Sequence, residues 1–107
     1  MISNPEYTLA LSDEAYDDLV NIQNYTYGRY GENQWQEYGA DLDKDMTHIL
    51  KNPLSGHTRN DLPDGYQAWI VREHVMIYRV EDKIIYLVRV LHSKMNFTFQ
   101  FSKNKAD

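Results

Sequence analysis

The chain has 107 residues and a mass of 12.7 kDa, which allows one small domain and leaves little room for an enclosed active site. A hydrophobic content of 42% excludes a wholly disordered chain, and the absence of cysteine excludes disulfides and thiolate metal sites. The net charge of −5 is divided unevenly: residues 1–50 carry two Lys or Arg against ten Asp or Glu, and residues 51–107 carry nine against six. An acidic half and a mildly basic half favour a protein partner over nucleic acid, since binding nucleic acid alone depends on many phosphate contacts.

The first predicted elements are one strand and two helices. Residues 7–12 alternate polar and apolar side chains, which is typical of a strand. Ser12 then supplies an N-cap, and the carboxylates that follow it favour a helix over residues 13–27. Apolar residues at intervals of three and four predict a second helix over residues 33–50, which Pro53 stops. Near the N-terminus, Asp13 and Glu14 come before any apolar run that is long enough for a signal peptide or a membrane span. We therefore expect a cytoplasmic protein without a membrane segment.

Two glycines, Gly28 and Gly31, are expected to end the first helix and to make the two helices a hairpin. The segment YTYGRY at this turn contains Tyr25, Tyr27 and Tyr30. Tyrosines can stack on nucleic-acid bases, but at a helix end they usually pack against the core, and we expect the latter.

The second half of the chain predicts an antiparallel meander after a long loop. Residues 52–65 are rich in turn formers, and loops of this length are usually functional or mobile. Strands are expected over residues 66–71, 74–80 and 84–91, joined by short turns. The last of them is apolar on both faces, so it should be central. One face would hold Ile84, Tyr86, Val88 and Val90, and the other would hold Ile85, Leu87, Arg89 and Leu91.

The tail, residues 97–107, contains Phe97, Phe99 and Phe101 alternating with polar residues. This pattern predicts a further strand or an extended segment, whose phenylalanines either close the open face of the sheet or bind a partner. The order β-α-α-β-β-β indicates an α+β fold, with an N-terminal helical hairpin packed on an antiparallel sheet. We expect a single domain over residues 1–107, with its core within about residues 7–96.

Four segments in order carry a family resemblance: YTLALSDEAYDDLVNI, ILKNPLSG, LPDGYQAWIVREHVMIYRV and IIYLVRVLHSKMN. Together they closely resemble the ParE toxins of bacterial type II toxin–antitoxin systems, within the ParE/RelE superfamily, over about residues 7–96. The most specific pieces are NPLSG, HVMIYRV and RVLHSKM, because no general strand or turn rule requires them. Three features depart from the family pattern: Asn96 stands where an Asp commonly follows the Met, Tyr66 stands where an Arg often follows the Gly, and the Phe-rich tail is not a family signature.

The resemblance implies a RelE/ParE-like fold and a toxin that causes growth arrest and serves plasmid stabilisation. It implies inhibition of DNA gyrase without enzymatic chemistry or a cofactor, and neutralisation by a cognate antitoxin. RelE relatives instead cleave messenger RNA on the ribosome, so a ribosome-dependent endoribonuclease is the alternative. A family member that binds its antitoxin but has lost toxicity is a third possibility.

The residues expected to bind the antitoxin or the target lie in the basic half of the chain, and they are Arg79, Arg89, His92, Lys94 and Met95. Competing interpretations are structural. The Arg89 stem can pack over apolar neighbours, Arg79 can pair with a nearby glutamate, and Met95 can plug the core.

Catalysis, in the ribonuclease alternative, would use His92 with Arg79 and Arg89. A second titratable group would be needed near His92, and the candidates are His57, His74 and Lys94. We expect no metal, because the acidic residues of the two helices follow no ligand spacing.

Overall fold

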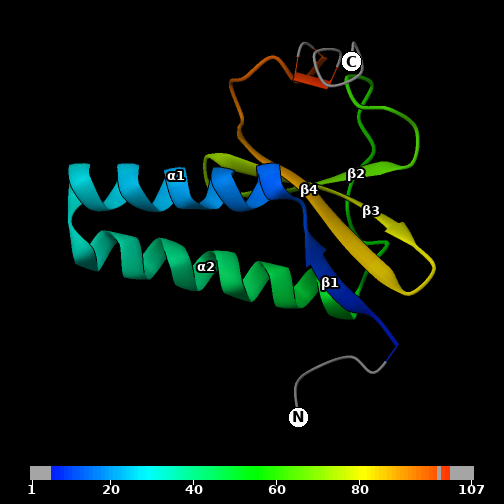
Figure 1. Cartoon of the computed structure of the whole chain (residues 1–107), viewed down its shortest axis with the longest axis horizontal. Coiled ribbons are helices and arrows are strands. Elements are labelled where there is room, and N and C mark those ends of the chain that lie inside the picture. Colours follow the sequence, from blue (N-terminus) through cyan, green and yellow to red (C-terminus); the bar gives the residue numbers. More distant parts are fainter. Residues whose placement is uncertain (1–5, 99, 102–107) are drawn as a thin grey trace.

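The computed structural model describes residues 6–98, 100 and 101, and its elements follow the predicted order β-α-α-β-β-β (Figure 1). They are β1 (Thr8–Leu11), α1 (Asp13–Tyr30), α2 (Glu32–Lys51), β2 (Tyr66–Val71), β3 (His74–Glu81) and β4 (Ile84–His92). The α+β fold predicted from the sequence is confirmed.

The strands form one sheet in the order β1-β4-β3-β2. β2, β3 and β4 make the predicted antiparallel meander, whereas β1 pairs with β4 in parallel, so the sheet is mixed. Two parallel strands need a long connection between them, and here α1, α2, β2 and β3 connect β1 to β4. β4 lies between β1 and β3 and is the central strand that the sequence predicted.

The first helix is longer than predicted. Its start is fixed by the Ser12 hydroxyl, which accepts the Ala15 N–H at 2.9 Å. The helix then continues through Gly28, because a single glycine costs a helix only about 1 kcal/mol relative to alanine and does not stop it. It ends at Gly31, whose φ of 92° lies in the region that glycine adopts without strain.

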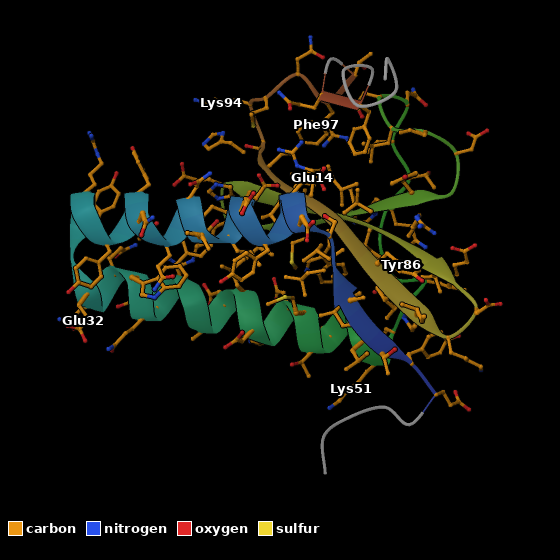
Figure 2. All side chains as sticks on the ribbon, in the orientation of Figure 1. Glu14, Glu32, Lys51, Tyr86, Lys94 and Phe97 are labelled. Atoms are coloured by element: carbon orange, nitrogen blue, oxygen red, sulfur yellow. The ribbon has the colours of Figure 1, made fainter. Side chains whose placement is uncertain are left out.

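The tyrosines near the hairpin turn do not pack against the core, so the expectation for them is wrong. Tyr25, Tyr27 and Tyr30 are 61%, 52% and 60% exposed. The turn points away from the sheet, and Glu32 marks it in Figure 2. The last turns of α1 therefore reach past the sheet surface that such side chains would need to contact.

Each face of the sheet has its own hydrophobic core. The first lies between the helices and the sheet and contains Ala15, Ile22, Tyr38, Leu42, Ile49, Val71, Met76, Tyr78, Ile85, Leu87 and Val90. The second lies on the opposite face and contains Leu62, Ala68, Val75, Ile77, Leu91, Phe97 and Phe101. Both faces of the sheet are thus covered, one by the hairpin (Figure 1) and the other by Leu62 of the loop and by Phe97 and Phe101.

The tail is helical at residues 97, 98, 100 and 101, so the predicted strand or extended segment is wrong there. Phe97 and Phe101 are only 1% and 8% exposed. A helical turn brings residues four apart to one side, which lets both rings reach the sheet. Phe97 and Phe101 thus close the second face of the sheet, which was one of the two possibilities that the sequence left open. Phe99 lies outside the described residues.

β4 contains an irregularity that changes which side chains share a face. Ile77 pairs with Arg89 and Tyr78 with Leu87, so Val88 is an extra residue between these two pairs. A bulge of this kind shifts the alternation of side chains along the strand. Val90 therefore joins Ile85 and Leu87 in the first core, and Leu91 joins the second, which corrects the faces predicted beyond Leu87.

Candidate functional site

Arg89 is held in an ion pair that the sequence analysis did not foresee. Its Nε and Nη2 atoms donate to the two carboxylate oxygens of Asp18 at 2.8 and 3.1 Å, and both side chains are about 15% exposed (15% and 14%). The same carboxylate accepts the Val90 N–H at 2.9 Å. The hydrogen bonds to Asp18 raise the pKa of Arg89 above its ordinary value. Arg89 thus joins α1 to β4.

The end of β4 forms a second cluster around His92, whose side chain is 37% exposed. Its Nε2 lies 3.5 Å from the Glu73 carboxylate, and its Nδ1 accepts the Lys94 N–H at 3.1 Å. The Met95 N–H donates to the His92 carbonyl oxygen at 3.0 Å, while the Met95 side chain is 42% exposed. Met95 therefore does not plug the core, and it lies with His92 and Lys94 at an accessible strand end.

Of the three residues that the sequence offered as a second titratable group near His92, His74 is the one whose ring contacts the His92 ring. The two residues are paired across β3 and β4, with ring centroids 5.3 Å apart and the rings edge to face. His74 Nδ1 is also hydrogen-bonded to the hydroxyl of Tyr38 on α2. His57, by contrast, pairs with Ala68 on β2, two strands away from β4.

Burial sets the protonation of this cluster. It raises the pKa of Tyr38 to about 12, and it lowers the pKa of His74, to which the nearby His92 also contributes. At neutral pH the cluster therefore offers a protonated phenol and an uncharged His74. These groups line one wall of a groove of about 370 Å³ between the helices and the β2–β3 turn.

The stability of the protein is expected to fall in mild acid because of His74. The unfolded chain binds a proton near pH 6.5, more readily than the folded chain, whose His74 pKa is lower. The contribution is therefore complete above about pH 6.5 and is lost as the pH falls through the folded pKa. Urea unfolding at pH 7.5, 6.5 and 5.5 should show a falling midpoint that His74→Phe flattens. If His74→Phe keeps the wild-type slope while the control His57→Gln changes it, His74 is not the group responsible.

Arg79 lies at the other end of the sheet. It pairs with Tyr66 and Tyr86 across the strands, is five positions along β3 from His74, and is therefore roughly 17 Å from the His92 cluster. Its guanidinium contacts Glu81 at 2.6 Å and stacks 4.4 Å from the centre of the Tyr86 ring, while the side chain stays 37% exposed. Figure 2 labels Tyr86 near the start of β4 and Lys94 on the segment that follows the strand. His92, Arg79 and Arg89 therefore do not converge on one site.

Two of the family-like motifs meet at the hydroxyl of Tyr78, a fully buried residue of HVMIYRV. This oxygen accepts the Gly56 N–H at 3.0 Å and lies 3.0 Å from the Pro53 carbonyl, to which it donates. A Cβ on Gly56 would lie only 2.6 Å from it, so no other residue fits there without movement. The motif NPLSG is thus the part of the long loop that is bound to β3.

Tyr78→Phe is expected to destabilise the protein by about 1–3 kcal/mol, because the Gly56 N–H and the Pro53 carbonyl lose their partner. Urea unfolding measures the loss, and amide hydrogen exchange at Gly56 should accelerate. Tyr16→Phe, which removes a hydroxyl from a side chain 61% exposed, is the matched control and should change stability by less than about 0.5 kcal/mol. Equal values for the two variants would contradict the assignment.

Some groups escaped the sequence analysis because their partners are distant in the chain. From the sequence, Tyr38 and Asp18 were expected only to be helix residues. Tyr38 in fact binds His74, 36 positions away, and Asp18 binds Arg89, 71 positions away. Over residues 6–98, 100 and 101, no group of three or more His, Asp or Glu side chains is placed to hold a metal ion. Within the same residues, neither helix has an apolar stretch that could cross a membrane.

Comparison with known proteins connects this geometry to a family. The model of the family described as the ParE toxin of the type II toxin–antitoxin system parDE matches residues 9–97. Toxin ParE1 of Caulobacter vibrioides is 34% identical over 86 residues, which cover 80% of this chain and 88% of the relative. Toxin ParE1 of Mycobacterium tuberculosis is 32% identical over 87 residues, with coverage of 80% and 89%.

Solved structures agree on the fold. The chromosomal ParDE system from P. aeruginosa superposes with a TM-score of 0.71 at 17% identity, over 81% of this chain and 96% of that chain. The E. coli DinJ–YafQ toxin–antitoxin complex gives a TM-score of 0.57 at 18% identity, over 81% and 92%. At these identities the structures indicate the fold alone, and the sequence matches carry the family. The chain therefore belongs to the ParE family of toxins of type II toxin–antitoxin systems.

Proposed function

We propose that this protein arrests growth in the cytoplasm by inhibiting DNA gyrase, and that a cognate antitoxin neutralises it by direct binding. The observation that carries the proposal is the family match over residues 9–97, which includes all three of the most specific motifs. The separation of Arg79 from His92 adds support for a non-enzymatic toxin, because the cations needed for phosphoryl transfer are not gathered at the imidazole.

A supercoiling assay tests the proposed target. Purified toxin in excess over gyrase should abolish the supercoiling of relaxed plasmid. Full gyrase activity at a large excess of well-folded toxin would contradict the proposal.

A ribosome-dependent ribonuclease remains the second candidate, because His92, His74 and Tyr38 place titratable groups along one groove. In a cell-free translation reaction this alternative predicts cleaved message with the wild-type protein and intact message with His92→Ala. Intact message with both proteins, together with inhibited gyrase, would reject it.

Antitoxin binding is proposed to use the exposed cations and the strand end, that is Arg79, Lys94, His92 and Met95. Arg79→Glu should weaken binding of the antitoxin about tenfold at low salt and less at high salt, because an exposed charge acts mainly through screened attraction. Lys44→Glu, an equal charge reversal on the exposed face of α2, is the matched control. Calorimetric titration that gives the same affinity for both variants would refute this placement. Arg89 is unsuited to the test because its reversal would oppose the Asp18 carboxylate.

A further inference from the structure

The groove beside the His92 cluster has two exposed tyrosines on its outer wall. Tyr25 and Tyr30 line it, at 61% and 60% exposure, while Tyr38, His74 and His92 line its inner end. Tyr16 and Tyr27 are on the same helix and similarly exposed, at 61% and 52%, but they lie outside the groove. Exposed aromatic side chains are therefore present both inside and outside the groove, which provides a built-in comparison.

The surroundings of the groove carry little charge. Residues 19–36 contain only two charged residues, Arg29 and Glu32, whereas residues 12–18 contain four. Glu32 accepts a hydrogen bond from the Gln36 amide at 3.0 Å. The polar groups that line the groove from this segment include the amides of Asn21 and Gln34. Aromatic rings with amides, and few Lys, Asp or Glu, are the composition of protein-recognition surfaces.

The charges at the inner end of the groove argue against nucleic acid as its occupant. Arg72 lines the groove, but its Nε is bound to the Asp41 carboxylate at 2.6 Å, and Glu73 stands beside it. A phosphate backbone needs several cations, and the described lining residues include only this arginine and two histidines. An acidic antitoxin segment would be disfavoured here for the same reason.

We propose that this groove is the surface with which the toxin holds its protein target. It would take an uncharged, amphipathic peptide segment, with one apolar or aromatic side chain between Tyr25 and Tyr30 and the segment's backbone on Asn21 and Gln34. A volume of about 370 Å³ has room for a few side chains, near the lower end of ligand-site volumes of about 300–1,000 Å³. The proposal rests on the proposed function in that the toxin acts on a protein. It assigns the target to Tyr25 and Tyr30 on the outer wall of the groove and the antitoxin to Arg79, Lys94 and Met95, with His92 at the border between the two surfaces.

The experiment compares two double variants of the full chain, Tyr25→Ser with Tyr30→Ser in the groove, and Tyr16→Ser with Tyr27→Ser outside it. Growth arrest on expression and gyrase inhibition report on the target, and the dissociation constant for the antitoxin reports on the second surface. The groove pair should require at least about 30-fold more toxin for inhibition, as expected for two hot-spot tyrosines, and keep its antitoxin affinity within about threefold. The control pair should stay within about threefold in every measurement. Gln34→Glu, which adds one charge to the groove, should weaken inhibition in the same direction.

Growth arrest by the groove pair at the wild-type level would overturn the inference. A loss of antitoxin affinity in that pair, or an equal loss of inhibition in the control pair, would also overturn it. If the wild type arrests growth without inhibiting gyrase and the groove pair does not arrest growth, the groove assignment stands and gyrase as the target fails. A wild type that neither arrests growth nor inhibits gyrase would overturn both.

Discussion

The variant Phe97→Ala is expected to lose about 3–5 kcal/mol of unfolding free energy, the range observed when a buried aromatic ring is removed from a core. Phe97 is 1% exposed and belongs to the second core with Leu62, Ala68, Val75, Ile77, Leu91 and Phe101. The Arg59 guanidinium also stacks on its ring, 4.3 Å from the centre. Removing the ring leaves a cavity and takes away one of the two phenylalanine contacts that hold the tail to the sheet, the other being Phe101.

Urea unfolding of the variant measures the loss directly. Leu54→Ala, which truncates an apolar side chain that is 78% exposed, is the control and should change stability by less than about 0.5 kcal/mol. A loss below about 1 kcal/mol for Phe97→Ala would mean that Phe97 is not packed in the core in solution.

Asp18→Ala is expected to cost about 3 kcal/mol, because it leaves the Arg89 guanidinium largely buried without its carboxylate. The Val90 N–H loses its acceptor in the same substitution. The matched control is Glu81→Ala, which breaks the more exposed pair with Arg79 and should cost less than about 1 kcal/mol.

A double-mutant cycle with Arg89→Met separates the ion pair from the rest of the effect. The double variant should be more stable than the sum of the two single losses predicts, because neither unpaired charge then remains. Additive losses, measured by urea unfolding, would show that Asp18 and Arg89 act independently.

Much of the fold follows from local patterns in the sequence. The Ser12 cap with its acidic first turn, the break at Pro53 and the three apolar runs after Gly65 each depend on neighbouring residues, and all correspond to observed elements. The end of α1 was placed too early, because the propensity of Gly28 is weak compared with the packing of the rest of the helix.

The candidate site was less predictable because it depends on contacts between distant segments. The sequence pointed to His92 and offered His74 as one of three possible partners, but strand periodicity does not reveal the bulge at Val88 or the pairing of Arg89 with α1. The alternating phenylalanines predicted a strand, yet the spacing of four positions between Phe97 and Phe101 also places both on one side of a helical turn. The choice between a strand and a helical turn depends on the apolar second face of the sheet, which both rings cover.

The structure also gives physical reasons for motifs that general rules left unexplained. The glycine of NPLSG lies against the hydroxyl of HVMIYRV, and the arginine of RVLHSKM is held by the first helix. Those residues therefore maintain the fold, while Arg79, Lys94 and Met95 lie at least partly exposed at the surface. A match to the family at these motifs indicates the scaffold more strongly than it indicates the target.

We propose that this toxin inhibits gyrase and that direct binding of the antitoxin relieves the inhibition. The most direct measurement is a supercoiling assay in which gyrase, inhibited by this toxin, is titrated with purified antitoxin. We expect the toxin to abolish supercoiling. Supercoiling should return when enough antitoxin has been added to bind all of the toxin. Gyrase that remains fully active in excess toxin, while that toxin still binds the antitoxin, would contradict gyrase as the target.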